Sequence, residues 1–371
     1  MGLFTGLMYV IFIIMGVTSG LTPMFSRQST PFGVAISGKH EEIEKYKKRY
    51  AIYNIVASLV LGLPLFIFLF MENQEQAEMW SAIYVMVGIG LFLLYSFGLY
   101  FKYRTDIQKW KEHLPKEEKA QAKRVVVDTK YHENLQTKSH FTFFIWQFAI
   151  IVIGVLIALA FYDRIPDEIP INWNAQFEVN HTIPKSVWSI LALPGLQLLM
   201  IPVLNMSNHA IVKSKQRLSP LDPKTASEKS RLFREAWSNL LFAITIATQL
   251  LISFLFLYSL FGQGRNAWLI FVVTVIYLLL AAGSPLYLTL KYGQAGEKLL
   301  DEEDIYYNDP DEEDNWKFGL IYYNKEDPSV FVERRFGIGS TFNLARWQAW
   351  LFIGGIILFT VLTLVWSLLL T

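Results

Sequence analysis

The segment "RIPDEIPINWN", Arg164 to Asn174, carries the side chains best suited to recognising a ligand. Two adjacent carboxylates, Asp167 and Glu168, can attract a cation or exchange a proton with a substrate. Trp173 adds an aromatic surface between two amide side chains. The sequence therefore predicts a ligand-binding surface built from Pro166, Asp167, Glu168, Pro170, Asn172, Trp173 and Asn174.

Two prolines decide the shape of this segment. Proline has no backbone N–H and holds φ at about −65°, so Pro166 and Pro170 disfavour a helix and favour an extended chain. A tryptophan next to a membrane-spanning run is typical of the headgroup level. A binding cap over the membrane and a rigid connector between two spans are both compatible with this pattern.

A second irregular segment, "NWKFGLIYYNKEDPSVFVERRFGIGSTFN", runs from Asn315 to Asn343. It reads as a strand, a turn at Asn-Lys-Glu-Asp-Pro, a second strand and a glycine-rich turn. The turn "FGIGS" could wrap an anion, but it lacks a Walker or dinucleotide-binding pattern, which favours a simple tight turn. We expect a small module that binds a protein partner through Trp316, Phe318, Tyr322, Tyr323, Arg334, Arg335 and Phe336.

The common catalytic and metal-binding patterns are missing from the sequence. There is no cysteine, which excludes thiolate catalysis and Cys-based metal sites. No serine stands in a G-x-S-x-G elbow, and no two histidines share a ligand spacing on one helix face. The acidic run Asp301 to Asp314 lacks the spacing of an EF-hand loop. We therefore predict no metal, no cofactor and no enzymatic activity.

Membrane-spanning helices must position these segments. Apolar residues make up 53% of the 371 positions and charged residues only 18%, a balance that soluble domains rarely show. Runs of about 20 apolar residues are long enough to cross the hydrocarbon core as helix. Eight such runs are present: Leu3 to Leu21, Ala51 to Met71, Trp80 to Phe101, Phe141 to Phe161, Ser186 to Leu204, Trp237 to Phe261, Ala267 to Leu290, and Trp347 to Leu370.

The positive charges predict which side of the membrane each loop faces. Of the 33 Lys and Arg residues, 30 fall in one set of alternate loops and 3 in the other. Since basic residues concentrate in cytoplasmic loops, we expect the segment Asn315 to Asn343 inside, and the segment Arg164 to Asn174 and both termini outside. No basic residue precedes Arg27, so the first span is expected to be a retained helix rather than a signal peptide.

The central parts of the spans contain polar side chains but no charges. The amides are Asn54, Gln147, Gln197, Asn239 and Gln249. Hydrogen bonding between helices is the favoured interpretation, and a polar transport path is the alternative. The missing charges argue against proton coupling through a buried carboxylate.

We expect an all-α polytopic membrane protein with about eight transmembrane helices and a small β-containing cytoplasmic module. The predicted regions are three helices with basic loops in 1–140, four helices in 141–290 with the Pro/Trp loop at 162–185, an acidic linker and the module in 291–346, and a last helix in 347–371.

The first segment resembles the hallmark of SdpI-like membrane proteins that carry domain of unknown function 1648, a motif similar to "L-P-D-x-I-P-x-H-W-N-x-x-G" after a transmembrane helix. The residues that carry the resemblance are Ile165, Pro166, Asp167, Ile169, Pro170, Asn172, Trp173 and Asn174. Asn172 stands where the family commonly has histidine, and the motif's glycine has no clear counterpart in "AQFEVN". A role specific to that histidine is therefore not carried over.

The segment Asn315 to Asn343 is similar to a second uncharacterised, DUF5808-like module that often accompanies the first. In the first loop, "TPFGVAIS" reads as a turn and a short strand, and its "FGVAIS" resembles a motif of the same group. The resemblance implies a plasma-membrane protein of a Gram-positive bacterium. Known relatives confer immunity to a secreted toxin peptide and can hold a repressor at the membrane.

These observations favour a non-enzymatic immunity or sensor component. Its expected partners are the lipid bilayer, a secreted peptide or envelope ligand outside, and a cytoplasmic protein inside. Basic loops beside a membrane suit anionic headgroups better than nucleic acid. A transporter of a small or amphipathic substrate is the alternative, and a membrane enzyme on lipid or cell-wall precursors, with Asp167 and Glu168 as its acids, is the third.

Overall fold

The computed structural model describes residues 2–36, 38–113, 135–173, 179–215, 223–262, 267–299 and 314–370. Within these ranges eight helices are long and apolar enough to cross a membrane. Their bounds are α1 Gly2–Phe25, α2 Glu41–Gly62 with its 3₁₀ continuation η2 Leu63–Phe70, α3 Gln74–Glu112, α4 His140–Ala160, α5 Val187–Lys213, α6 Pro223–Phe261, α7 Ala267–Tyr292 and α9 Trp347–Leu370. The chain is a mostly helical, multi-pass membrane protein, as the hydropathy pattern predicts.

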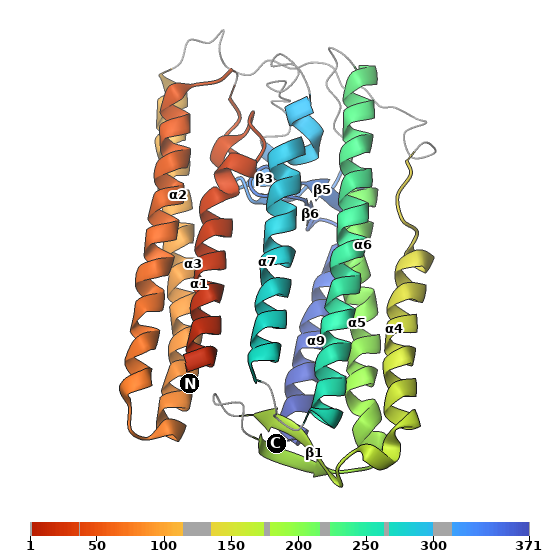
Figure 1. Ribbon diagram of the computed structural model, residues 1–371. Helices are drawn as coiled ribbons and strands as arrows, with labels where there is room; N and C mark the ends of the chain where they lie inside the picture. Colours follow the sequence, from red (N-terminus) through yellow and green to blue (C-terminus); the bar gives the residue numbers. More distant parts are fainter. Residues whose placement is uncertain are drawn as a thin grey trace.

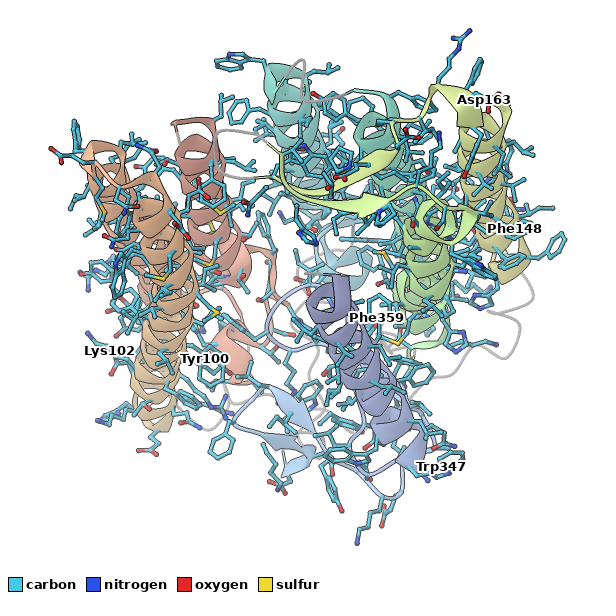
Figure 2. All side chains as sticks on the ribbon, turned by 90° about the horizontal axis from the view of Figure 1, so that it is seen from below. Tyr100, Lys102, Phe148, Asp163, Trp347 and Phe359 are labelled. Atoms are coloured by element: carbon cyan, nitrogen blue, oxygen red, sulfur yellow. The ribbon has the colours of Figure 1, made fainter. Side chains whose placement is uncertain are left out.

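The helices form two groups, and α7 connects them. Helices α1, α2 and α3 pack together, as do α4, α5 and α6, and α7 contacts both α1 and α6 (Figure 1). Seen from below, α9, which carries the labelled Trp347 and Phe359, lies between the two groups at the lower edge of the view (Figure 2). It contacts α5 of the second group. Few residues of α9 are buried, so most of this helix is available to lipid.

Local sequence signals explain where several helices begin and bend. The side chain of Asn73 accepts a hydrogen bond from the Gln76 amide at 3.0 Å and starts α3. Ser139 and Ser186 cap α4 and α5 in the same way, which satisfies amides that would otherwise lack partners. Pro64 stands two positions after Gly62, and there α2 changes into the tighter helix η2, because proline cannot donate the next α-helical bond.

Short strands lie at opposite ends of the helices (Figure 1). At one end, the 3₁₀ turn η4 Tyr162–Arg164 leads into β1 Glu168–Trp173, which pairs antiparallel with β2 Val179–Pro184. We call the β1–β2 pair the hairpin, and this end of the helices the hairpin end. At the module end, β3 Trp316–Lys317 pairs with β4 Ile321–Tyr322, and β5 Phe331–Glu333 pairs with β6 Ser340–Phe342. The 3₁₀ turns η1 Pro31–Gly33 and η5 Gln294–Leu299 also lie at the module end.

One expectation about local structure is confirmed and one needs correction. The Asn-Lys-Glu-Asp-Pro turn lies between two strands, β4 and β5, which pair with β3 and β6 respectively. An isolated bridge from Tyr322 to Asn343 joins these two hairpins. In "TPFGVAIS" the turn is present as η1, whereas Val34 to Ile36 pairs with no strand of the described residues. Its side chains are buried instead in the protein interior, which replaces strand pairing as the source of their stability.

Exposed tryptophans mark two levels along the helices. Trp80, Trp188 and Trp268 are exposed near the first turns of α3, α5 and α7, at the hairpin end. Trp347 and Trp350 are exposed in the first turn of α9, at the module end. Indole favours the membrane–water interface, so these two levels agree with a bilayer crossed by the helices between them.

Candidate functional site

The hairpin is held to the helix ends by apolar contacts. Ile165 and Ile169 are 2% and 3% exposed, since both point into the bundle. Helices α4, α5 and α6 all contribute to this cluster, whose buried members are Ala158, Ile165, Ile169, Ile190, Phe256 and Leu260. The hairpin therefore closes one end of the second helix group.

Lys185 fastens the base of the hairpin. Its backbone amide donates to the Asp167 carbonyl at 2.7 Å, and its Nζ donates to the Ile165 carbonyl at 2.8 Å. The same Nζ lies 3.7 Å from the Asp167 carboxylate, whose side chain remains fully exposed. Asp167 is thus fixed through its backbone while its carboxylate stays open to solvent.

The remaining predicted ligand-binding residues differ in accessibility. Glu168 is exposed and accepts a hydrogen bond from the Thr182 hydroxyl across the hairpin. Pro166 is half-buried and Pro170 is buried. Trp173 is half-buried, and its indole Nε1 has no hydrogen-bond partner among the described residues. The side chain of Asn172 and the whole of Asn174 lie outside the described residues.

At the module end, an aromatic cluster joins the first loop to the module. Phe32 is fully buried and its ring stacks on Phe336 of the module at 5.5 Å between centroids. Tyr50 of α2 and Tyr100 of α3 contact the same two rings. Four separate parts of the chain meet in this cluster, which therefore fixes the module to the first helix group.

Two glycines allow the first loop and the module to touch. Gly33 and Gly319 have φ values of 73° and 72°, a region that favours glycine. A Cβ on Gly33 would lie 2.7 Å from the Gly319 Cα, closer than any side chain tolerates. The Tyr100 hydroxyl lies 3.2 Å from the Phe32 carbonyl and 2.8 Å from the Phe318 carbonyl. This close approach is therefore held by a hydrogen-bond donor as well as by packing.

A buried charge cluster fastens the module to both helix groups. Glu333 of β5 pairs with Arg27, just after α1, at 2.8 Å and with Arg234 of α6 at 3.5 Å. All three side chains are at most 10% exposed. Arg27 and Glu333 are 306 residues apart in the chain, so the sequence reading did not bring them together. Their burial requires that both charges be paired.

Hydrogen bonds between side chains and the backbone of the glycine-rich turn complete its attachment. The Gly337 amide donates to the Ser26 hydroxyl at 2.7 Å, and the Gln294 side chain bonds both the amide and the carbonyl of Gly339. The Thr30 hydroxyl donates to the Arg335 carbonyl at 3.2 Å. "FGIGS" is thus a tight turn whose polar groups bind the protein itself.

The seven residues predicted to bind a partner fall into two sets. Trp316, Tyr322 and Arg335 are buried, and Phe336 is half-buried in the aromatic cluster. The exposed residues are Phe318, Tyr323 and Arg334. Only the exposed residues are accessible to a partner while the module is in this position.

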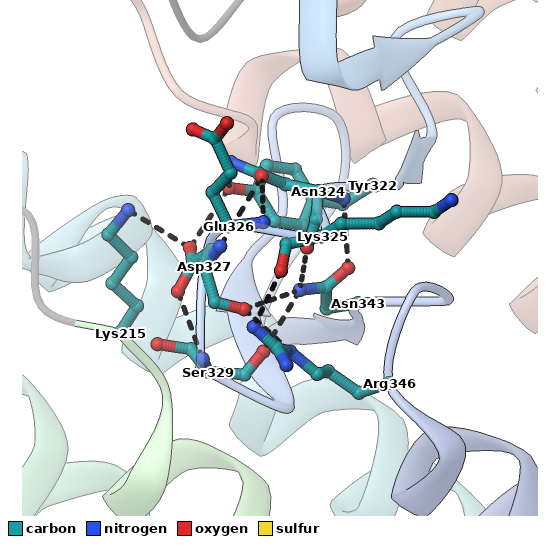
Figure 3. Close-up of polar contacts among 9 residues, drawn as sticks. All are labelled: Lys215, Tyr322, Asn324, Lys325, Glu326, Asp327, Ser329, Asn343 and Arg346. Atoms are coloured by element: carbon teal, nitrogen blue, oxygen red, sulfur yellow. Dashed lines mark hydrogen bonds and ion pairs between the residues drawn. The ribbon is translucent and has the colours of Figure 1, made fainter.

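Asn343 is the polar centre of the module, and the sequence reading missed it. Its Nδ2 lies within hydrogen-bonding distance of three carbonyls, those of Asn324, Asp327 and Ser329 (Figure 3). Its Oδ1 accepts from the amides of Asn324 and Ala345. The side chain is fully buried. One amide therefore fixes the turn between β4 and β5 against the end of β6.

Asp327 joins this network to α5. Its carboxylate accepts from the Tyr322 hydroxyl at 2.9 Å and pairs with Lys215 at 3.0 Å, just beyond the end of α5 (Figure 3). Burial by itself raises the pKa of Asp327, but the hydrogen bonds from Ser329 and Lys215 outweigh burial and bring the pKa below its ordinary value. The carboxylate is therefore charged in the folded protein.

Three of the predicted membrane amides form a chain across three helices. Gln249 of α6 donates to Gln147 of α4 at 3.4 Å, and Gln197 of α5 donates to Gln249 at 3.3 Å. Asn54 is buried and donates to the Tyr50 carbonyl at 2.9 Å, whereas Asn239 is exposed. The three glutamines thus hydrogen-bond between helices within the membrane-spanning region.

Comparison with family models identifies two segments. Residues 149–198 match the domain of unknown function DUF1648. This DUF1648 segment holds most of α4, the hairpin and the first half of α5. Residues 325–350 match a family of unknown function, DUF5808, and contain β5, β6, Asp327 and Asn343. No curated protein and no solved structure matches the chain.

The two matches fall on the two irregular elements of the fold. The DUF1648 segment supplies the exposed carboxylates of the hairpin, and the DUF5808 segment supplies Glu333 and the Asn343 network. Neither description assigns an activity.

Proposed function

We propose that this protein is a non-enzymatic immunity or sensor component of the plasma membrane. In this proposal the hairpin meets a secreted peptide or another envelope ligand, and the module end lies in the cytoplasm and reports to a protein partner. The resemblance to SdpI-like proteins supports the same division of roles. The exposed carboxylates of Asp167 and Glu168 favour a ligand with positive charge.

The proposal rests mainly on the length of α6, which contacts the hairpin at one end and the module at the other. This helix of 39 residues packs against the hairpin through Phe256 and Leu260 and binds Glu333 of the module through Arg234. The stretch from Arg234 to Phe256 spans about 33 Å at the helical rise, close to the roughly 30 Å of a hydrocarbon core. A displacement at the hairpin can therefore reach the module along one continuous helix.

The distribution of charge supports the proposed orientation. Arg27, Lys215 and Arg234 lie at the module end, where the basic loops belong by the alternation of the spans. Among the 33 Lys and Arg residues, Arg164, Lys185 and Arg265 are the ones assigned to the other side. Basic residues are retained in the cytoplasm, so we place the module there and both termini outside.

The surface offered to a cytoplasmic partner is the exposed side of the β3–β4 hairpin. Phe318 is 64% exposed, and Ile321 and Tyr323 are each 42% exposed. Aromatic side chains of this kind are enriched in protein interfaces. Arg334 adds an exposed charge on the β5–β6 turn.

The test replaces the hairpin tryptophan and challenges cells with membrane-active peptides. Trp173→Ala is expected to reduce resistance or signalling while the amount of protein in the membrane is unchanged. Trp188→Ala is the matched control, because Trp188 is 82% exposed on the first turn of α5 at the same end. Full resistance and signalling in the Trp173→Ala cells would count against the proposal.

A transporter is the second candidate, since the amide chain through Gln147, Gln249 and Gln197 crosses the second helix group. Uptake into proteoliposomes that is abolished by Gln249→Leu would favour this function. If the wild-type protein shows no uptake and Gln249→Leu only lowers its stability, the result favours a packing role for the amides.

A further inference from the structure

A groove between α5 and α9 is not explained by the sensor function. It encloses about 590 Å³, a volume typical of small-ligand sites. Its walls come from residues 199–209 of α5 and residues 351–362 of α9, with one residue from the start of α4. Both walls belong to membrane-spanning helices, so the groove opens toward lipid rather than toward water.

The polar groups of this groove gather at one end. Its lining is apolar except for His140, Asn205 and His209. The His209 Nδ1 lies 3.1 Å from the His140 Nε2, which joins the start of α4 to the last turns of α5. Apolar residues such as Leu199 and Leu362 line the part that lies deeper among the spans. The groove is therefore amphipathic along its length.

The groove is as long as one leaflet is deep. From His209 to Leu199 on α5 the helical rise gives about 15 Å, half of the roughly 30 Å hydrocarbon thickness. On α9 the stretch from Leu351 to Leu362 gives about 17 Å. A groove of this length, polar at the membrane surface and apolar toward the midplane, has the profile of a single phospholipid.

The charged residues near the groove favour an anionic lipid headgroup. Lys213 follows His209 by one turn of α5, and both are on the same face of the helix. Lys138 stands two residues before His140, and its carbonyl accepts a hydrogen bond from Asn208, which brings the backbone of Lys138 close to the last turns of α5. Among the described residues that line the groove, none is a carboxylate. Basic groups near a membrane surface attract anionic lipids, each by about 1 kcal/mol.

We propose that this groove binds one anionic phospholipid, with the phosphate at His140 and His209 and an acyl chain between α5 and α9. The His209 ring also contacts Phe331 of β5 and Phe352 of α9, at 5.6 and 6.4 Å between centroids. A bound headgroup therefore lies against the module, and the lipid joins α9 to the rest of the protein.

Two neighbouring glycines provide the test. Gly355 lines the groove, Gly354 does not, and a Cβ at either position meets nothing within 4 Å. Gly355→Trp fills the groove, and Gly354→Trp is the matched control on the adjacent helix position. Binding of phosphatidylglycerol and of phosphatidylcholine to the purified full chain is measured by native mass spectrometry.

The proposal predicts one tightly bound phosphatidylglycerol per wild-type chain, about tenfold weaker binding in Gly355→Trp and unchanged binding in Gly354→Trp. His209→Ala is expected to lower the preference for phosphatidylglycerol over phosphatidylcholine. Equal binding by both glycine variants, or equal affinity of the wild type for both lipids, would overturn the proposal. Thermal unfolding without added lipid checks each variant, and Gly355→Leu replaces the tryptophan variant if that one does not fold.

Discussion

The hairpin end and the module end are held in place by different forces. The hairpin is anchored by Ile165 and Ile169 among apolar side chains, while its carboxylates remain in solvent. The module is also held by an aromatic cluster, but it adds buried charges and amides that the hairpin lacks among the described residues, with Glu333 between Arg27 and Arg234. Apolar anchoring leaves polar groups available for a ligand, whereas buried charges must all be paired within the protein. The hairpin end is therefore suited to recognition and the module end to a defined closed state.

This difference predicts how much stability each end loses when one residue is substituted. Apolar contacts weaken gradually as area is lost, at about 25 cal/mol per Å². A buried ion pair that loses one partner leaves an uncompensated charge, which costs about 3–5 kcal/mol. The module end should therefore be the more sensitive to a single substitution.

The largest effect is expected from Glu333→Ala. Removal of this carboxylate leaves two largely buried guanidinium groups without their shared partner, so the variant should be destabilised by about 3–5 kcal/mol. Unfolding of the purified protein in detergent, followed by heat and by proteolysis of the module, measures the loss. Glu326→Ala is the control, because that side chain is exposed in the neighbouring turn. Equal stability of the two variants would show that the charge cluster does not hold the module.

An intermediate effect is expected from Asn343→Asp. The substitution replaces a buried amide by a carboxyl group that faces the carbonyls of Asn324, Asp327 and Ser329. Burial keeps this group protonated, so it can donate to one of these carbonyls and leaves the others unsatisfied. Unsatisfied buried groups cost roughly 1–3 kcal/mol, so the module should become protease-sensitive while the helices stay intact. Asn315→Asp, at a half-buried position before β3, tests the same chemical change elsewhere in the module. An Asn343→Asp protein as protease-resistant as the wild type would contradict the central role of this amide.

The smallest effect is a dependence of stability on pH through Asp327. Its pKa is lowered in the folded protein, so the unfolded chain binds the proton more readily. The contribution of Asp327 to stability is complete above the pKa of the unfolded chain, about 3.9, and is lost as the pH falls through the lower folded value. Thermal unfolding between about pH 5 and pH 2 should show this loss in the wild type and a weaker one in Asp327→Asn. Identical pH profiles of the wild type and Asp327→Asn would show that the charge of Asp327 does not contribute to stability.

Much of the fold follows from the sequence alone, because apolar runs report the part of each helix that lies in lipid. The last span, Trp347 to Leu370, has the bounds of α9. Hydropathy does not show where a helix continues in water, so α3 reaches Glu112 and α6 begins at Pro223, each beyond its predicted span. Helix-forming charged residues extend these elements without leaving an apolar signal.

The candidate sites are less accessible to sequence reasoning. The prolines correctly indicate an extended segment, but its partner strand β2 Val179–Pro184 carries no distinctive pattern. The Arg27–Glu333 pair and the Phe32–Phe336 contact join residues about 300 positions apart, and only the folded chain brings them together. The partner-binding prediction treats the module as a free domain, whereas three of its seven residues, Trp316, Tyr322 and Arg335, are buried.

The orientation of the two ends is tested most directly by cysteine labelling, because the chain has no cysteine of its own. Asp167→Cys and Lys325→Cys place one thiol on an exposed position at each end. The account predicts that a membrane-impermeant maleimide labels the Asp167→Cys protein in intact cells and the Lys325→Cys protein only after lysis. Labelling of the Lys325→Cys protein alone in intact cells would contradict it.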